Sequence, residues 1–426
     1  MSNDFSLSTQ FKLSTVTIDG IEVAGLFKQI SLYENIFRPV ITGSIVMSDS
    51  DGASFIQKNQ IEGNEDFAFT ATNANGQELN FSGVLNGQRN KVQDGANVLY
   101  TFDFTTQQVE KNEGSFVTKR FNEEKPEDVV SEMLKRIEGG EHSQMDRMQA
   151  KGEPISFVGG RRRPTDVIGY VLKHGVMTSG SPAQVTDNKK EQLEQSSGST
   201  GALFWQTIDG YRYVAIDDLL AGQGGNAAGT FTHQLQNKGD SLSTLMNTVI
   251  TYDFEEMGDM QTKMRSGAFR SVNISFDLDK GLYKEVEYNG EDKMTEKQKK
   301  RVNKPTRYIM RPFTNERFQQ DCTRAQPDQW DKTRKTLQQG EARQNTFSDQ
   351  KGTFVLPPNF TIRAGDSIEI KIPRVESEFG GGYNEKHSGK YIVKQVGHHL
   401  LSDGRGYTKV KTIRSTTQQD DASSQQ

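Results

Sequence analysis

Apolar and polar residues alternate with a period of two along much of this chain. The alternating runs begin near Phe11, Phe67, Val98, Ile250, Val272 and Ile368, and the first run slips by one residue between Leu13 and Val16. Such alternation places apolar groups on one face of a strand, as in an antiparallel sheet with one solvent-exposed face. Between the runs lie turn pairs that suit hairpins: Asn75-Gly76, Asp94-Gly95 and Asp209-Gly210. The pattern predicts a mainly β fold.

Helical periodicity is confined to a few segments. Pro126 suits the first position of a helix, and the apolar residues after it fall on one stripe: Val129, Val130, Met133, Leu134 and Ile137. A second helix is expected to start at the N-cap candidate Thr165 and to end at Gly175. The stretch Glu316–Gln344 is mostly helix-forming but polar. We therefore expect an α+β fold, mainly β with a small α/β domain.

Two segments lack any periodicity and are rich in polar residues. Thr178–Gly201 and Thr416–Gln426 cannot bury enough apolar surface to offset the entropy of ordering, so we expect a mobile loop and a disordered tail. The remaining chain divides into a first β unit over 1–110, a mixed α/β domain over 111–220, a second β unit over 221–255 and 345–415, and a polar inserted domain over 256–344.

Composition narrows the class of protein. Only 33% of residues are apolar and the mean hydropathy is -0.73, which fits an elongated chain that completes its burial against partners, or one with disordered segments. With 52 basic and 56 acidic residues the net charge is -4, without the basic excess typical of proteins that grip nucleic acid. The single cysteine, Cys322, excludes an internal disulfide and a zinc site of several thiolates.

Targeting signals are also missing from the sequence. Met1–Gln10 is polar, unlike a signal peptide, and no apolar run approaches the roughly 18 residues of a membrane helix. We therefore expect no membrane anchor, and a protein that is made and kept in a cytoplasm or in something assembled there.

Motifs that carry nucleotide or acyl chemistry are incomplete. Gly389-Lys390 resembles the end of a phosphate loop, but Asn384 stands where the motif needs glycine, and Tyr391 stands where it needs serine or threonine. Gly380–Gly382 cannot complete a dinucleotide fingerprint, because Glu385 occupies the third glycine position. No Gly-x-Ser-x-Gly pattern occurs. We expect no catalytic residue, no cofactor-binding residue and no cofactor.

Metal and anion sites have equally weak signals. His398 and His399 are adjacent, so on a strand they point to opposite faces and are expected to be structural or surface histidines. Asp49, Asp51 and Gly52 hint at a calcium loop, but Met47 stands at its first position and a turn is the better reading. Two basic clusters remain, the exposed turn Arg161–Arg163, which suits an acidic partner or a phosphate, and Lys293–Lys304, which reads as a solvated loop or helix. No metal site is expected.

The order of several segments resembles a known family. The helix Lys125–Ile137 is similar to the Pro-Glu-Asp helix that opens the second domain of phage tail-hub proteins, and Leu203–Gly210 with Tyr213–Leu220 is similar to the hairpin that closes it. Asn359–Asp366, the Ile368–Ile372 strand, Gly389–Val396, the histidine pair and Tyr407–Ile413 follow the order of the closing barrel in these proteins. The chain thus resembles central baseplate hubs of contractile-tailed, T-even-like bacteriophages, within the wider group of tail hubs and secretion-spike hubs. Residues 258–344 match least.

This resemblance implies a structural protein without enzymatic activity. Hubs of the group are trimers with two similar antiparallel β-barrels per subunit, and the resulting ring joins a three-fold spike to a six-fold tail tube. The implied partners are the chain itself, the spike protein, a tube or tube-initiating baseplate protein, the tape-measure protein and surrounding wedge proteins, with DNA only in transit. The implied location is the virion tail baseplate, assembled in the cytoplasm of a bacterial host.

Two alternatives stay open. The first is the hub part of a contractile injection or secretion-type device, although such proteins usually fuse hub and spike, and here 13 residues without spike repeats follow Ile413. The second is a tail-associated cell-wall hydrolase, against which the incomplete motifs count.

Overall fold

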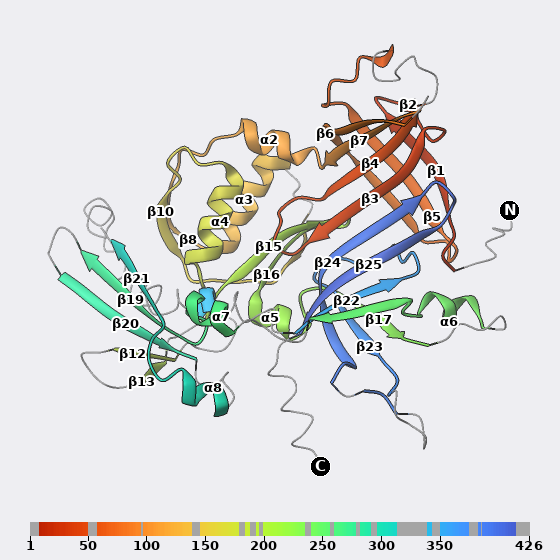
Figure 1. Ribbon diagram of the computed structural model, residues 1–426. Coiled ribbons are helices and arrows are strands. Elements are labelled where there is room, and N and C mark those ends of the chain that lie inside the picture. Colours follow the sequence, from red (N-terminus) through yellow and green to blue (C-terminus); the bar gives the residue numbers. More distant parts are fainter. Residues whose placement is uncertain are drawn as a thin grey trace.

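Strands dominate the structure. The computed structural model describes residues 8–49, 58–94, 97–138, 145–178, 184–187, 193–195, 199–234, 240–255, 260–277, 282–290, 296–312, 339–342, 350–374, 382–384 and 386–414. Within these ranges the strands form one 13-stranded sheet, one five-stranded sheet, one three-stranded sheet and two strand pairs. Figure 1 shows two neighbouring β units, a helical domain beside them, and the five-stranded sheet apart from both. The predicted mainly β, α+β fold is confirmed.

The first β unit is antiparallel throughout and follows the order β3-β4-β7-β6-β5-β1-β2. Its strands are β1 (Phe11–Ile18), β2 (Ile21–Glu22), β3 (Phe27–Asn35), β4 (Thr42–Asp49), β5 (Asp66–Asn73), β6 (Glu78–Asp94) and β7 (Asn97–Thr105). The slip in the first run is a register shift between Leu13 and Thr15. The inward positions of these strands build an aromatic core in which Phe104 lies 4.6 Å from Phe67 and 5.0 Å from Phe81, between ring centroids.

Helices cover one side of the mixed domain. Its elements are α2 (Gln108–Gly114), β8 (Arg120–Glu124), α3 (Pro126–Glu138), β9 (Met145–Met148), β10 (Ile155–Val158), α4 (Pro164–His174), β11 (Val176–Met177), β14 (Ser199–Thr200), β15 (Ala202–Thr207), β16 (Gly210–Ala215) and α5 (Ile216–Leu220). All five apolar residues of the predicted α3 stripe are buried. The predicted N-cap Thr165 is wrong: α4 begins at Pro164 after Arg163, because proline has a preset helical φ, and the Thr165 amide donates instead to Asn112.

The second β unit repeats the strand order of the first. It comprises β17 (Ala227–Thr232), α6 (Leu242–Met246), β18 (Thr251–Glu255), β22 (Gln350–Leu356), β23 (Ser367–Lys371), β24 (Gly389–Leu401) and β25 (Gly406–Arg414). Its order β17-β23-β24-β25-β22-β18 matches β1-β5-β6-β7-β4-β3 strand for strand. One strand differs in direction, since β17 runs parallel to β23 whereas β1 is antiparallel to β5. The predicted similarity of the two units is therefore confirmed in their strand order.

A pair of glycines marks the same position in both units. Gly43 lies opposite Phe104 in the β4–β7 pair, and Gly352 lies opposite Thr412 in the equivalent β22–β25 pair. A Cβ atom on Gly43 would lie 2.1 Å from the Phe104 ring, and one on Gly352 would lie 2.8 Å from the Phe354 ring. Each unit therefore packs an aromatic ring against bare backbone at this point.

Direct strand pairing joins the two units. β24 pairs with β3 from Gln395 opposite Asn35 to Leu401 opposite Gln29, so one continuous sheet runs through both units (Figure 1). We call this β3–β24 pairing the seam. The alternating runs do not include β3, and the strand over Gly389–Val396 is expected only from the resemblance to tail hubs, so neither the seam nor one of its two strands follows from the pattern.

The five-stranded sheet combines two distant segments. It contains β19 (Arg270–Asp277), β20 (Leu282–Asn289) and β21 (Arg307–Pro312) together with β12 (Gln184–Asp187) and β13 (Leu193–Gln195), and α7 (Met260–Ser266) and α8 (Glu296–Arg301) belong to the same region. The expected loop over Thr178–Gly201 is therefore wrong in part, because β12 pairs with β20 and β14 pairs with β11. A partner strand supplies the backbone hydrogen bonds that the local composition does not predict.

Other expectations fall outside the described residues. These include the tail Thr416–Gln426, and all of Glu316–Gln344 except 339–342. No helix in the described ranges combines the length and apolar composition that a membrane span requires.

The aromatic core of the first unit predicts a large effect of Phe104→Ala. The ring is buried among three other phenylalanines, so its loss should lower the free energy of unfolding by about 3 to 5 kcal/mol. Chemical denaturation followed by near-ultraviolet circular dichroism measures the shift. Val92→Ala is the control, because Val92 is exposed on β6 of the same unit, and a similar shift in both variants would contradict the prediction.

Candidate functional site

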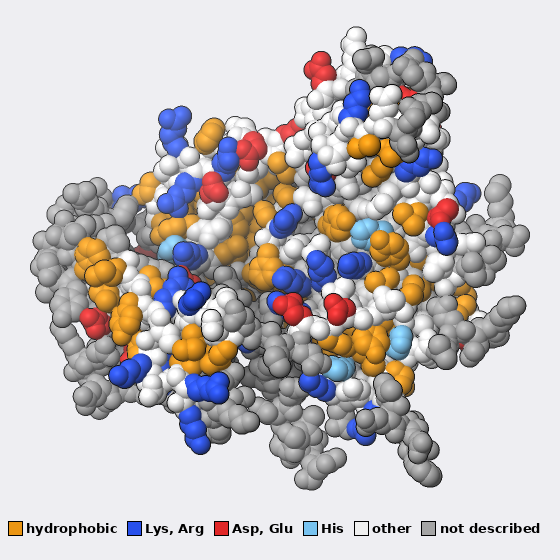
Figure 2. Space-filling model, in the orientation of Figure 1, with side chains coloured by type: hydrophobic (Ala, Val, Ile, Leu, Met, Phe, Trp, Pro, Cys, Tyr) orange, Lys and Arg blue, Asp and Glu red, His pale blue; other side chains and the backbone are white. Residues whose placement is uncertain are grey.

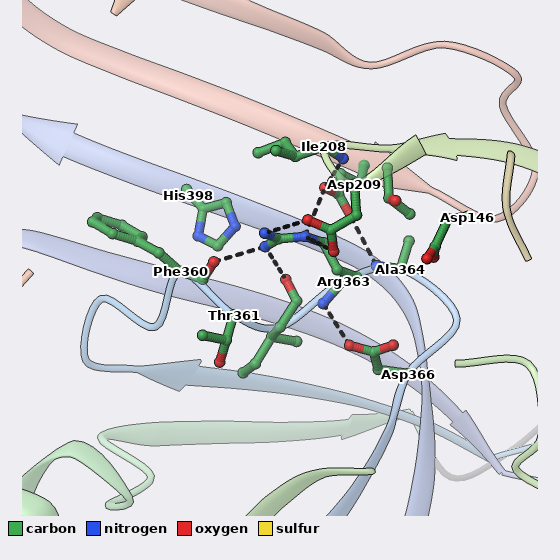
Figure 3. A network of polar contacts seen from close by, with 12 residues as sticks. Asp146, Ile208, Asp209, Phe360, Thr361, Arg363, Ala364, Asp366 and His398 are labelled. Carbon is green, nitrogen blue, oxygen red and sulfur yellow. Dashed lines mark hydrogen bonds and ion pairs between the residues drawn. The ribbon is translucent and has the colours of Figure 1, made fainter. Parts of the chain in front are cut away.

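The most concentrated polar chemistry in the described chain lies where the two β units and the mixed domain meet. Glu34 comes from β3, Asp209 from the β15–β16 turn, Arg212 from β16, and Arg363 and Asp366 from the segment between β22 and β23. Figure 3 shows Asp209 and Asp366 on either side of Arg363. We call these five residues the junction network.

Arg363 holds the centre of the network. Its Nε and Nη2 atoms donate to the two carboxylate oxygens of Asp209 at 2.8 and 3.1 Å, and its Nη1 atom donates to the carbonyl oxygen of Phe360 at 2.7 Å (Figure 3). The paired geometry fixes the guanidinium plane. Arg363 therefore ties the second β unit to the hairpin of the mixed domain.

Glu34 is fully buried beside Arg363. Its carboxylate accepts the backbone N–H groups of Ile208 and Ala364, each at 2.9 Å, and lies 4.0 Å from Arg363 Nε. Burial raises the pKa of Glu34, while the Arg363 charge and the two N–H donors favour the ionised form. One side chain of the first β unit thereby contacts backbone of both other parts.

Arg212 makes the second link. Its fully buried guanidinium donates to Asp366 at 2.9 Å, to the carbonyl oxygen of Ala364 at 3.0 Å, and to Asp146. Burial opposes its charge, but Asp366 and Asp146 outweigh burial and raise the pKa of Arg212. Asp366 also accepts the Asn226 N–H at 2.9 Å, so its buried charge has several donors.

Close packing surrounds the charged groups. Trp205 donates from Nε1 to the carbonyl oxygen of Ala364 at 2.9 Å, and its ring packs against Gly365. Gly365 has φ +90°, and a Cβ atom there would lie 2.4 Å from the Trp205 ring. Only glycine meets both conditions without strain. The apolar side chains of this cluster, among them Ile36, Leu203, Val214, Ile392 and Ile413, come from all three parts.

The histidine pair adjoins the network, and its two rings lie on opposite sides of β24. His398 contacts Thr408 and Phe360, whereas His399 contacts Ser31, Tyr33 and Tyr407 on the other side of the strand. Across the described ranges no group of three or more His, Cys, Asp or Glu residues is placed to hold a metal ion. Burial lowers the pKa of His398 to about 3, with the Arg363 charge and His399 adding to it. Burial and Lys409 lower the pKa of His399 to about 4.

The predicted basic clusters lie elsewhere. In the Arg161–Arg163 turn, Arg161 has φ +57°, Arg162 lies 5.1 Å from the Tyr170 ring and Arg163 pairs with Glu113 at 2.6 Å. The helical part of Lys293–Lys304 is α8, and on the face drawn in Figure 2 basic side chains are interspersed with apolar and acidic ones.

Only part of each incomplete motif lies in the described residues. Asp49 is buried at the end of β4, while Asp51 and Gly52 lie outside the described residues. Gly389 begins β24, and of Gly380–Gly382 only residue 382 is described.

Sequence reasoning did not identify the junction network. Asp209, Arg363 and Asp366 lie in segments that carry the family resemblance, but without an assigned role, and Glu34 lies in a segment that no sequence pattern singles out. Four of the five charged groups are buried and the fifth, Asp209, is partly exposed. Their ion pairs and hydrogen bonds hold three parts of the chain in one orientation. The network is therefore a structural junction.

Replacing Arg363 should destabilise the protein, because it leaves a buried carboxylate without its counter-ion. Arg363→Ala leaves the Glu34 carboxylate buried without its cation, so we expect the free energy of unfolding to fall by about 3 to 5 kcal/mol. The matched control is Arg89→Ala, which removes the exposed Arg89–Asp103 pair and should cost about 1 kcal/mol or less. Equal losses in urea denaturation would contradict a junction role.

His398 should make the protein sensitive to acid. Between pH 6.5 and about 3 the unfolded chain binds a proton at His398 and the native chain does not, so stability falls as the pH falls through this window, by about 1.4 kcal/mol per pH unit. The raised pKa of Glu34 makes stability rise as the pH falls. This contribution is present in both the His398→Gln variant and the unaltered chain. Unfolding measured at several pH values should show a flatter dependence for His398→Gln than for the unaltered chain; parallel curves would refute the assignment.

Comparison with known proteins gives the fold. No family model matches the chain, and no curated protein matches it. Among solved structures, the 43 kDa tail protein of prophage MuSo2 from Shewanella oneidensis superposes with a TM-score of 0.52 and 9% identity, covering 95% of this chain and 98% of that one. The tail protein from Neisseria meningitidis MC58 gives 0.54 and 10% identity, covering 97% and 99%. The chain therefore has the fold of these phage tail proteins, as its resemblance to tail hubs implied.

Proposed function

We propose that the chain is the structural hub of a phage tail baseplate. In this proposal three copies form a ring that adapts a three-fold spike to a six-fold tail tube, serves as a platform for tube assembly and surrounds the channel for DNA ejection. The observation that carries the proposal is the repeated strand order of the two β units.

Symmetry links this repeat to the function. A closed ring of three subunits presents three copies of every surface. If each subunit carries the same sheet architecture twice, the ring offers six similar surfaces to a tube while keeping three-fold symmetry toward a spike. A single chain with two like β units is the smallest unit that meets both requirements.

The junction supports the proposal because an adaptor must hold its repeats at a fixed spacing. The seam pairs seven residues of β24 with seven of β3, and the junction network clamps the same region through Glu34 and Arg363. A flexible link between the units would allow their relative orientation to vary. The buried charge pairs disfavour other relative orientations of the two units, since a shifted arrangement leaves the charges unpaired.

The proposed partners follow from this geometry. They are the chain itself, the spike protein, the tube or tube-initiating baseplate protein, the tape-measure protein and neighbouring wedge proteins, with DNA in transit. The proposed location is the tail baseplate of the virion, and the proposed protein has no catalytic activity.

Light scattering of the purified chain, alone and with its spike protein, tests the proposal. We expect a mass of three times 47.8 kDa, or that mass plus the spike. Electron microscopy of the particles should show six similar densities around a central axis. A strict monomer in the presence of the spike would refute the hub function, and turnover of peptidoglycan that a point mutation in this chain abolishes would favour the hydrolase alternative.

A further inference from the structure

Several cations gather on the outer face of the seam. Lys409 and Lys411 lie on β25, Lys394 lies on β24, and Arg38 lies in the loop that follows β3. Within the described part of the chain none of these four side chains forms an ion pair. We call the four residues the basic surface, and Figure 2 shows a row of basic side chains near the centre of the face drawn there.

Strand pairing places two of these cations beside the seam. Directly opposed residues of antiparallel strands project from the same face of a sheet, and neighbouring strands lie about 5 Å apart. Two rows of opposed residues cross β3, β24 and β25: Asn35, Gln395 and Lys411 in the first, and Tyr33, Gly397 and Lys409 in the second. Lys409 and Lys411 therefore stand one strand away from the seam, on the face that Tyr33 and Gln395 share.

Lys394 adds to a local excess of positive charge. It lies at the register shift between β24 and β25, and its Nζ atom is 5.4 Å from the centre of the Phe37 ring. Burial lowers the pKa of Lys394, and the charges of Lys351 and Lys411 lower it further, although Glu255 acts against them. An anion that approaches this surface would relieve the repulsion between the lysines.

A small depression opens beside the cations. It has a volume of about 140 Å³ and is lined by Tyr33, Asn35, Arg38, Thr42 and Gln395. Among the described residues, none forms a hydrogen bond with the side chains of Tyr33, Arg38 or Gln395. The depression therefore offers a guanidinium, an amide and a hydroxyl group as donors to whatever enters it.

The size of the depression limits what it can hold. Pockets for separate small molecules have volumes of roughly 300 to 1,000 Å³, whereas this one is about 140 Å³. The end of a single side chain fits such a space. A carboxylate is the group that a guanidinium binds best, because two parallel N–H groups can donate to its two oxygens.

We propose that the basic surface binds an acidic protein segment, with one carboxylate of the segment seated in the depression against Arg38. The neighbouring acidic side chains of the segment lie over Lys394, Lys409 and Lys411. This inference goes beyond the proposed hub function, which assigns no surface of the chain to a partner.

The surroundings favour a protein over a nucleic acid as the occupant. Asp253 follows Lys411 in the same row of opposed residues, two strands further on, so a phosphate backbone that continued along the row would meet a like charge. Single-stranded nucleic acids are bound by stacking of bases on aromatic side chains. Here Tyr407 stacks on His399 with a centroid distance of 4.6 Å, and Tyr33 packs against the same histidine at 5.5 Å.

Fluorescence anisotropy with a labelled hexaglutamate peptide tests the proposal on the full-length chain. The measurement is made at low ionic strength, because salt screens ion pairs between exposed groups. We expect hexaglutamate to bind more tightly than hexaglutamine, which lacks the charges, and more tightly than an oligothymidylate of equal charge.

Single substitutions locate the binding. Arg38→Gln removes the cation of the depression and should raise the Kd of hexaglutamate about tenfold, and Lys411→Gln should raise it about threefold. The matched control is Lys12→Gln on β1, which should leave the Kd unchanged. All three side chains are exposed, so the midpoint of thermal unfolding should be the same in the three variants.

Each outcome decides the proposal. Weaker peptide binding by Arg38→Gln and Lys411→Gln, with Lys12→Gln unaffected, supports it. Tighter binding of the oligothymidylate than of hexaglutamate would show that the surface takes nucleic-acid phosphates, and the proposal would be wrong. Absence of peptide binding, or equal affinity in all three variants, also overturns it. The mass of the particle in light scattering is independent of these results, so the hub function is tested separately.

Discussion

The pairing of β3 with β24 is the contact on which the rest of this structure depends. It brings residues 29–35 against residues 395–401, across nearly the whole chain. The entropy lost in closing so long a loop must be recovered by contacts that form only when the ends meet. Glu34 lies within this pairing, opposite Val396, and is also bound by Ala364 and Ile208. The seam and the junction network therefore stabilise each other.

Buried charge gives the seam a unique geometry. An apolar contact of the same area would tolerate a slide of one residue, whereas Glu34 and Arg363 would lose their donors and acceptors if β3 shifted against β24. Breaking one member of such a network costs more than the network contributes to stability, because an unpaired charge remains in a medium of low polarity. The relative orientation of the two units is thus fixed by the energetic penalty for other arrangements, as the proposed adaptor role would require.

The two β units show how far a repeated architecture can persist without a repeated sequence. What they share is backbone: the strand order, the glycines Gly43 and Gly352, and a register shift at the same point of β6 and β24. The two units differ in what lies beside the edge strands β3 and β18. β3 is covered by β24 of its own chain, while β18 leads into the inserted sheet and is exposed.

Local periodicity by itself determined several elements of this protein, because the spacing of a segment's own apolar residues shows which face of a strand or helix is buried. The strands near Phe67 and Ile368 and the stripe of α3 follow from the pattern directly. The helix does not begin at Thr165 because a proline one residue earlier starts it. The strands β12 and β14 do not follow from the local pattern because their partners, β20 and β11, lie elsewhere in the chain. The resemblance to tail hubs likewise came from the order of segments.

Only the tertiary structure decided which of these elements are neighbours. Nothing near Glu34 in the sequence distinguishes a buried carboxylate from an exposed one, because its donors lie 174 and 330 residues away. The same holds for Arg212 and Asp366, which are separated by 154 residues. A period of two shows that one face of a strand is buried, but strand edges carry no sequence signature of the strand that will pair with them. The seam therefore emerges only when the chain is folded.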